Sequence, residues 1–186
     1  MRAHKESGAR VFYLDECMFT SRTYLQREFS SVNTHITINA TQFNMEATAF
    51  LGVIAMDLNV FYYELYKKSV NSEKFIPFLQ ELRRKVGKAP IILYMDNLRV
   101  HWSKLVKPYY AELNITPVWA PSYSPELNAI EFVFSKLKGS VRRIRLNDMM
   151  KGKKRTYYEM VPEAVKKLTK EDVNNCIKHV FKLFDI

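Results

Sequence analysis

Three acidic side chains follow or border apolar segments of this chain, where they could hold divalent cations. Asp96 comes directly after the apolar run Ile91–Met95, a pattern typical of a parallel strand buried on both faces. Asp15 follows a second apolar run, Val11–Leu14, and Glu131 lies beside the apolar stripe of a predicted helix. A carboxylate at the border of a hydrophobic core needs a partner that offsets its desolvation, and a metal ion is one such partner.

Carboxylates that hold metal ions suit chemistry on phosphodiesters. Such chemistry needs an activated oxygen nucleophile and a stabilised leaving oxygen, and two divalent ions about 3.5–4 Å apart supply both. Magnesium prefers oxygen ligands and keeps several waters, so a few carboxylates and a substrate phosphate suffice. Asp15, Asp96 and Glu131 are therefore candidate ligands for two Mg²⁺ ions, with Mn²⁺ as a substitute and Asp15 as the bridge. Taken singly, each acid is more often a turn, cap or solvated residue.

The first part of the chain predicts an antiparallel meander that carries Asp15. Alternation along the strand Arg10–Cys17 places Asp15 and Glu16 on opposite faces, so we interpret Glu16 as a capping or surface acid. Further extended segments are predicted at Arg22–Phe29 and Val32–Ala40. A hairpin is then predicted from Ala47–Met56 and Val60–Tyr66, on either side of the turn-like residues Asp57, Leu58 and Asn59.

Alternating helices and strands are predicted after the meander. A helix capped by Asn71 or Ser72 runs to Val86 and is ended by Gly87. After the strand that ends at Asp96, the pattern indicates a helix around Trp102–Leu113, in which Pro108 kinks or restarts the helix, and a strand at Ile115–Trp119.

A long helix that carries Glu131 is predicted to begin at Ser124. Serine is a good N-cap, Pro125 suits the first helical position and Glu126 suits the first turn. Apolar residues recur along it at helical spacing: Leu127, Ile130, Phe134, Leu137, Val141 and Ile144. Two more helices are predicted, one over Pro162–Leu168 and one after a capping box of Thr169 and Asp172.

A set of polar, proline and apolar residues recurs in a fixed order around the second and third acids. Its members are Asp96, Asn97, His101, Ser124, Pro125, Leu127, Asn128, Ile130 and Glu131. This set resembles the catalytic core of IS630/Tc1/mariner superfamily transposases. Residues 97–130, 34 in all, separate Asp96 from Glu131 as in that family, and Asp15-Glu16 matches its first acid. Ala129 replaces a usual proline and Phe134 occupies a usual aromatic position, and neither departure touches a carboxylate.

The resemblance covers nearly the whole chain and implies both a fold and an activity. The implied fold is α/β and RNase H-like, with a mixed sheet of an antiparallel meander plus parallel strands, flanking helices and C-terminal helices. The implied domain is a single DDE catalytic domain over residues 1–186. It would nick transposon ends with water and join the freed 3′-hydroxyls to target DNA, typically at TA. Asn97, His101 and Asn128 are auxiliary candidates, and His101 either orients a phosphate or water or caps the following helix.

Three alternative functions stay open at this point. One is a host-recruited protein of the same fold that excises DNA without reinserting it. Another is a DNA-binding or assembly subunit that has kept the acids without catalysis. An RNA–DNA hybrid nuclease is the third. Metal-dependent nicking of plasmid DNA separates the catalytic functions from the binding subunit, and a hybrid substrate tests the nuclease.

Charge points to nucleic acid as the partner. The 186 residues carry a net charge of +10 with a pI near 9.5, which favours a polyanion, DNA before a membrane surface. On the face of the helix that carries Glu131 lie Lys138, Arg142 and Arg145, which predicts a basic strip for a DNA backbone; a solvated outer face is the alternative. A basic stretch extends the set of candidate DNA contacts: Lys151, Lys153, Lys154 and Arg155.

The remaining features concern the cellular setting. Cys17 and Cys176 form no CxxC pair, which argues against a structural zinc site and suits a reducing compartment. The N-terminus lacks a signal peptide, and the longest apolar run, Ala49–Met56, is far shorter than the ~20 residues of a membrane span. We expect an intracellular protein without a membrane partner, in the nucleus if the source is eukaryotic, which we favour, or otherwise in the bacterial cytoplasm or nucleoid.

Assembly on DNA is a further expectation. The expected partners are transposon ends and target DNA, bound by a homodimer or a larger assembly. Members of the resembled family normally carry helix-turn-helix domains ahead of the catalytic core. Met1 lies nine residues before Arg10, so we expect those domains to be absent from this chain.

Overall fold

A mixed sheet with strand order β3-β2-β1-β4-β5 forms the centre of the protein. The computed structural model describes residues 8–21, 45–56, 62–122 and 124–183. The central strand, β1 (Arg10–Phe19), pairs antiparallel with β2 (Thr48–Ala55), which pairs antiparallel with β3 (Tyr62–Lys67). On its other side β1 pairs parallel with β4 (Ile91–Met95), and β4 pairs parallel with β5 (Ile115–Trp119). The predicted meander followed by parallel strands is therefore confirmed.

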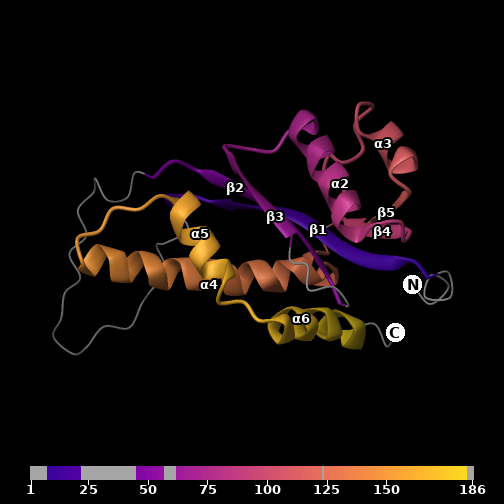
Figure 1. Cartoon of the computed structure of the whole chain (residues 1–186). Helices are drawn as coiled ribbons and strands as arrows, with labels where there is room; N and C mark the ends of the chain where they lie inside the picture. Colours follow the sequence, from indigo (N-terminus) through magenta and orange to yellow (C-terminus); the bar gives the residue numbers. More distant parts are fainter. Residues whose placement is uncertain (1–7, 22–44, 57–61, 123, 184–186) are drawn as a thin grey trace.

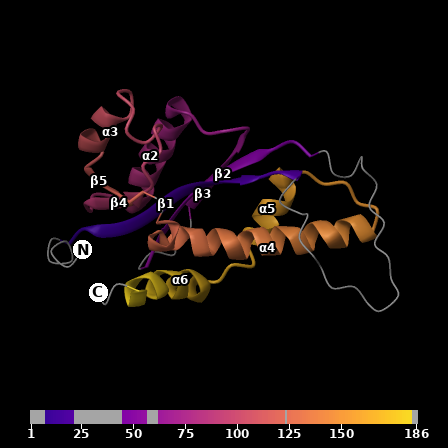
Figure 2. The same ribbon diagram turned by 180° about the vertical axis from the view of Figure 1, so that it is seen from behind.

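Helices cover both faces of this sheet (Figure 1). The helices α2 (Ser72–Val86) and α3 (Lys107–Glu112) lie on one face, and α4 (Ala129–Met150) runs along the other. Figure 2 shows from behind that α5 (Tyr157–Val165) and α6 (Lys170–Leu183) lie beside α4. No helix in the described ranges is long and apolar enough to cross a membrane.

The alternating side chains of β1 divide the interior into two cores. Tyr13 and Cys17 face the core under α4, whereas Phe12 and Leu14 face the core under α2. Asp15 has the parity of Tyr13 and so lies on the α4 side. β4 is buried along its whole length, as its continuous apolar run predicts for a parallel strand covered on both faces.

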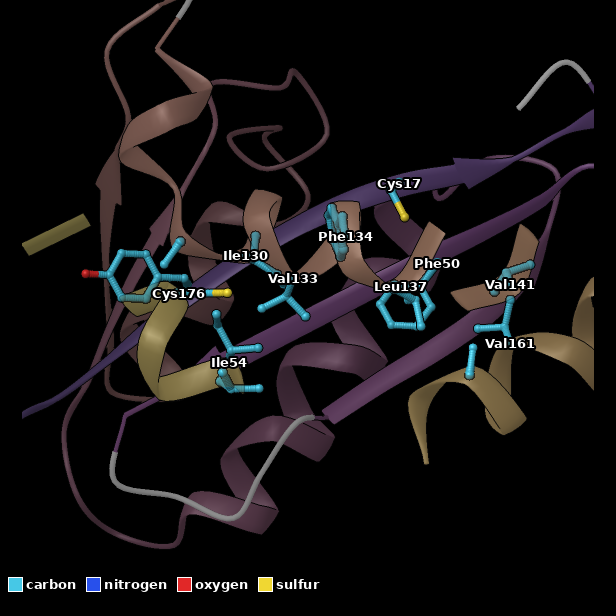
Figure 3. Close-up of a cluster of buried hydrophobic side chains, with 14 of the residues drawn as sticks. Cys17, Phe50, Ile54, Ile130, Val133, Phe134, Leu137, Val141, Val161 and Cys176 are labelled. Atoms are coloured by element: carbon cyan, nitrogen blue, oxygen red, sulfur yellow. The ribbon is translucent and has the colours of Figure 1, made fainter. Parts of the chain in front are cut away.

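The apolar stripe of α4 packs on the sheet in one continuous core (Figure 3). Ile130, Phe134 and Leu137 from α4 contact the side of the sheet that carries Phe50 and Ile54. Farther along, the same core includes Val141 of α4 and Val161 of α5, whereas Cys176 of α6 lies near the start of α4, beside Ile130 and Val133. Burial of this stripe removes apolar area from water along most of α4, which is the main reason that the helix docks here.

The ends of two helices follow the predicted capping chemistry. The Asn71 side chain accepts a hydrogen bond from the Lys74 N–H (3.0 Å) at the start of α2, and Gly87 ends this helix with φ 78°. At the start of α6 the Asp172 N–H donates to Thr169 Oγ1 (3.0 Å), and the Thr169 N–H donates to Asp172 Oδ2 (3.0 Å).

The predicted start of the long helix at Ser124 is wrong. Ser124 begins only a short 3₁₀ turn, η3 (Pro125–Leu127), and its side chain caps nothing. The α-helix begins at Ala129, and Asn128 is extended at φ −98° and ψ 105°. The reason is tertiary, because the Asn128 side chain reaches across to β1 instead of continuing a helical turn.

Two other helix boundaries also differ from the prediction. The helix expected around Trp102–Leu113 is limited to Lys107–Glu112, with Pro108 in its first turn, where its missing N–H costs nothing. The helix expected from Pro162 instead begins at Tyr157, after a capping box of Thr156 and Glu159. The predicted segments Arg22–Phe29 and Val32–Ala40, and the turn at residues 57–59, lie outside the described residues.

Candidate active site

The strand register brings Asp15 and Asp96 to the same level of the sheet. Every paired residue of β1 and β4 differs by the same number, as in Tyr13 with Tyr94 (94 − 13 = 81). Asp15 and Asp96 differ by this number too (96 − 15 = 81), although Asp96 lies one residue beyond the end of β4. Because neighbouring strands are about 4.8 Å apart, the two acids lie close enough to interact directly.

The start of α4 brings the third acid to this pair. Glu131 lies in the first turn of α4, and its N–H donates to the Asn128 carbonyl (3.0 Å). The side-chain amide of Asn128 donates to Asp15 Oδ2 (3.0 Å) and to the Leu14 carbonyl (3.2 Å). The carboxyl groups of Asp15 and Glu131 lie close enough for each to affect the pKa of the other. Asn128 is therefore the link that sets the position of Glu131 over β1.

A glycine in β2 lets α4 approach the sheet at this point. Gly52 pairs with Asp15 across the antiparallel ladder. A Cβ added to Gly52 would lie 2.6 Å from Phe50 Cε1 and 3.3 Å from Ile130 Cδ1. Ile130 directly precedes Glu131, so a larger residue at position 52 would push away the turn that carries the third acid. Glycine within a strand often marks such a close approach.

Burial and mutual repulsion disfavour the charged forms of two of the acids. Burial raises the pKa of Asp15 to about 7, and the negative charge of Asp96 adds to this effect. Burial also raises the pKa of Glu131, although the nearby ammonium group of Lys138 acts against it. Three carboxylates in mutual repulsion form a site that favours a bound cation.

His101 holds the carboxylate of Asp96. Its ring is buried, and the ring centroid lies 4.8 Å from that of Phe75 with the two planes tilted by 36°. Its Nδ1 lies 2.9 Å from Asp96 Oδ1. The carbonyl of His101 accepts a hydrogen bond from the Tyr110 hydroxyl (2.6 Å), which fixes the loop. Burial would raise the pKa of Asp96, but the hydrogen bond to His101 lowers it below its ordinary value. The structure therefore places His101 behind the acid, and this contact corresponds to neither of its two predicted roles.

The three acids offer only oxygen ligands, which suit hard divalent cations. In the described ranges, no group of three or more His, Cys, Asp or Glu side chains is arranged to hold one ion. A two-ion site needs only a few carboxylates for each ion, because phosphate and water oxygens complete the shells. Asn128 Oδ1 is buried beside Asp15 without a hydrogen-bond partner, so a further oxygen is left at the site. An all-oxygen donor set suits Mg²⁺ or Mn²⁺.

The basic residues predicted to contact DNA fall into four groups. Lys138 and Arg142 are half-buried on the face of α4 that carries Glu131, whereas Lys151, Lys153 and Lys154 are exposed beyond its end. Arg155 is bound to Asp148 (2.6 Å) and to Glu163 (2.7 Å). Arg145 is a correction to the predicted strip, because it is buried and donates to the Tyr157 hydroxyl (3.3 Å) where α5 packs on α4.

Sequence reasoning missed Gly52 as a residue that shapes the site. Its position inside the apolar strand segment Thr48–Ala55 was the available signal, because an isolated glycine in a strand indicates a bulge or a close neighbour. The packing of His101 on Phe75 had no comparable signal, since these two residues meet only through the fold. The auxiliary candidate Asn97 is exposed, and its carbonyl accepts a hydrogen bond from Trp102 Nε1 (3.4 Å).

Comparison with protein families gave one match that covers most of the chain. The model described as "DDE superfamily endonuclease" matches residues 10–151. Comparison with curated protein sequences found no match.

Solved structures of Mos1 transposase share this fold. The pre-cleavage Mos1 transpososome matches with a TM-score of 0.74 at 18% identity, over 98% of this chain and 56% of that one. The Mos1 mariner paired-end complex with Mn matches with a TM-score of 0.69 at 20% identity, over 95% of this chain and 54% of that one. The Mos1 catalytic domain with raltegravir and Mg matches with a TM-score of 0.64 at 18% identity, over 98% of this chain and 84% of that one. The predicted RNase H-like fold is confirmed, and this chain spans about 56% of the first of these proteins.

Proposed function

The chain belongs to the DDE superfamily endonucleases, and from this premise we propose that it is a transposase catalytic domain that cleaves DNA phosphodiesters and transfers the freed strand. The observation that carries the proposal is the level placement of Asp15 and Asp96 on adjacent parallel strands, with Glu131 delivered above them by α4. Three separate secondary-structure elements each bring one acid to the same point. A chance cluster of surface charges needs no such convergence.

Two of the three proposed ligands, Asp15 and Asp96, have a neighbour that fixes their orientation. Asp15 would bridge two ions, while Asp96 and Glu131 would each hold one of them. When bound there, divalent ions activate the attacking oxygen and stabilise the leaving oxygen. Asn128 holds Asp15 through its amide, and His101 holds Asp96 through Nδ1. Such supporting hydrogen bonds keep ligands in the geometry that the ions require.

The Mos1 structures support this assignment of ions and substrate. Those proteins were solved as a transpososome, as a paired-end complex with Mn and as a catalytic domain with Mg. By analogy, we propose Mg²⁺ or Mn²⁺ as the cofactor, transposon-end and target DNA as partners, and an assembly of at least two copies on DNA. The resemblance to IS630/Tc1/mariner transposases adds TA as the proposed target. The excess of basic residues, with a net charge of +10, supports a polyanionic partner.

Lys138 is the basic residue best placed to guide DNA to the acids. It lies on the face of α4 that carries Glu131, and its charge acts on both Glu131 and Cys17. Arg142 continues this face by one helical turn and Arg145 does not, because its side chain is buried. We therefore propose a short strip of Lys138 and Arg142 for the backbone of the cleaved strand.

Nicking of supercoiled plasmid DNA in Mg²⁺ tests the proposed function. Asp96→Asn should abolish nicking but leave DNA binding intact or slightly tighter, because it removes a metal ligand and a negative charge near the phosphates. Glu171→Gln removes one charge from an exposed position of α6 and serves as the matched control, with unchanged nicking.

The possible outcomes separate this function from its rivals. Nicking by Asp96→Asn at the wild-type rate would refute the three-acid assignment. DNA binding without any nicking by the wild type would indicate a binding or assembly subunit. Nicking without joining of 3′-ends would favour an excision protein, and preference for an RNA–DNA hybrid would favour the nuclease.

A further inference from the structure

A cavity of about 410 Å³ lies at the end of α4 opposite to the acids. It is lined by the last turns of α4, the connection to α5, and parts of β2 and β3. Figure 1 shows the chain turning back from this end of α4 into α5. Glu131 and Asp148 are 17 residues apart on α4 (148 − 131), and a rise of 1.5 Å per residue separates the two places by about 25 Å. The cavity is therefore distinct from the site of the three acids.

The charge that lines this cavity is positive. Among its described lining residues, five side chains are basic and two are acidic, an excess of three positive charges. Both acids are already bound by a base, since Asp148 lies 2.6 Å from Arg155 and Glu46 lies 3.9 Å from Lys67. Neither acid is paired with Lys153 or Lys154 in the described part of the chain, and an anion is the ligand that these two side chains favour.

Lys153 and Lys154 are the cations most accessible to such an anion. Both are exposed, and neither forms an ion pair with any residue that the structure describes. Their backbone is fixed by the turn that ends α4, where Gly152 has φ 65° and the Lys153 N–H donates to the Asp148 carbonyl (2.8 Å). This turn fixes the backbone of both lysines, whose side chains line the cavity.

The remaining wall is aromatic and hydroxylic. Tyr157 is buried and supports the floor, whereas Tyr158 is 36% exposed at the edge. Thr156 and the thioether side chains of Met149 and Met160 complete this side. Basic side chains beside an aromatic ring suit a phosphate with its attached nucleoside. The basic side chains neutralise the phosphate, and the aromatic ring can pack on the nucleoside.

We propose that this cavity binds a backbone phosphate and its adjoining nucleoside at a second point on the DNA that the acids cleave. This inference rests on the proposed function for the identity of the DNA. A distance of about 25 Å corresponds to about seven base-pair rises of 3.4 Å. The second contact thus lies well away from the cleaved bond, where it fixes the direction of the duplex along α4 without taking part in the chemistry.

The salt dependence of DNA affinity tests this site. The double variant Lys153→Gln, Lys154→Gln removes both ammonium groups that hold the one proposed phosphate, so the slope of log K against log salt should become shallower by about 0.9. The matched control is Lys88→Gln, Lys178→Gln, which removes the same charge from two exposed lysines on α6 and after α2. Its slope should change little. The probe is a fluorescently labelled duplex of random sequence, followed by anisotropy, and thermal melting verifies that both variants fold.

Each outcome bears on the cavity independently of the catalytic assignment. Equal slope changes in the two double variants would overturn the cavity site, because they would indicate diffuse attraction. A change in self-association by sedimentation, with the DNA slope unaltered, would overturn it as well and assign the cavity to an acidic segment of a second copy. If the wild type fails to nick DNA but the double variant Lys153→Gln, Lys154→Gln still has a shallower slope of log K against log salt, the proposed catalysis is refuted and the DNA contact is not.

Discussion

Asn128 is hydrogen-bonded to Asp15 through its side-chain amide, at 3.0 Å from Nδ2 to Oδ2. The same amide donates to the Leu14 carbonyl at 3.2 Å, so one side chain ties the first turn of α4 to the central strand. Both residues are buried. The relative position of the first and third acids therefore depends on this one residue, which is neither an acid nor a part of the sheet.

Asn128→Ala should both destabilise the protein and slow DNA nicking. Loss of the amide leaves the buried Leu14 carbonyl without this donor, which costs about 1–3 kcal/mol of unfolding free energy. Urea unfolding and plasmid nicking measure the two effects. Asn147→Ala, at an exposed position of the same helix, is the control and should change neither by much. Full activity of Asn128→Ala would show that the amide does not position the acids.

The sequence predicted those parts of the site that depend on periodicity and strand ends. The run Ile91–Met95 indicated a buried strand that ends at an acid, and alternation along β1 placed Asp15 on the correct face. The start of α4 could not be found in this way. Local preference favours Ser124 as a cap. The helix instead begins after Asn128, because the Asn128 side chain is hydrogen-bonded to Asp15, more than a hundred positions earlier in the chain.

Arg145 shows the same limit for a surface. Helical spacing places it on one face with Glu131, and spacing alone predicts exposure. The residue is buried because α5 folds back over the end of α4 and brings Tyr157 to its guanidinium group. Whether a helical face is covered depends on a later element, which the local pattern does not encode.

The raised pKa of Asp15 predicts that the metal-free protein loses stability as the pH rises. Its carboxyl group has an ordinary pKa of 3.8 and a pKa of about 7 in the folded state. Between these values the unfolded chain releases the proton and the folded chain keeps it, so this contribution is complete below about pH 4 and lost by about pH 7. The loss amounts to about 4 kcal/mol at most.

Asp15→Asn removes this titration. In EDTA, the unfolding free energy of the variant relative to the wild type should rise with pH across that window, as measured by urea unfolding at several pH values. Glu171→Gln, at an exposed site, should leave the pH profile of the wild type unaltered. Parallel profiles for Asp15→Asn and the wild type would contradict the burial of a protonated carboxyl group at position 15.

Gly52→Ala should destabilise the fold by about 1–3 kcal/mol, because the new methyl group overpacks the contact between β2 and α4. Phe50 is the first obstacle, and it is itself held by Tyr63 and Phe134. Thermal or urea unfolding checks the loss. The control is Gly139→Ala inside α4, where an added Cβ meets nothing within 4 Å. This substitution should stabilise the helix by up to about 1 kcal/mol. Equal effects at the two glycines would argue against a close approach at Gly52.

Lys138→Gln should weaken DNA binding in a salt-dependent manner. If this side chain contacts one phosphate, the slope of log K against log salt becomes shallower by about 0.9. Lys136 is the matched control, because it lies two residues earlier on another face of α4 and is bound to Asp172 (2.7 Å). Lys136→Gln should change the slope much less. A larger effect at Lys136 would place the DNA on the other side of α4.

Manganese soaked into crystals of the wild-type protein tests the central claim most directly. Anomalous diffraction should show two peaks about 3.5–4 Å apart, both in contact with Asp15, one shared with Asp96 and the other with Glu131. Asp96→Asn crystals, soaked in the same way, should lose or weaken the peak at residue 96. Peaks that are absent from these three carboxylates, or that persist unchanged in Asp96→Asn, would contradict the account of a metal-dependent DNA-cleaving site.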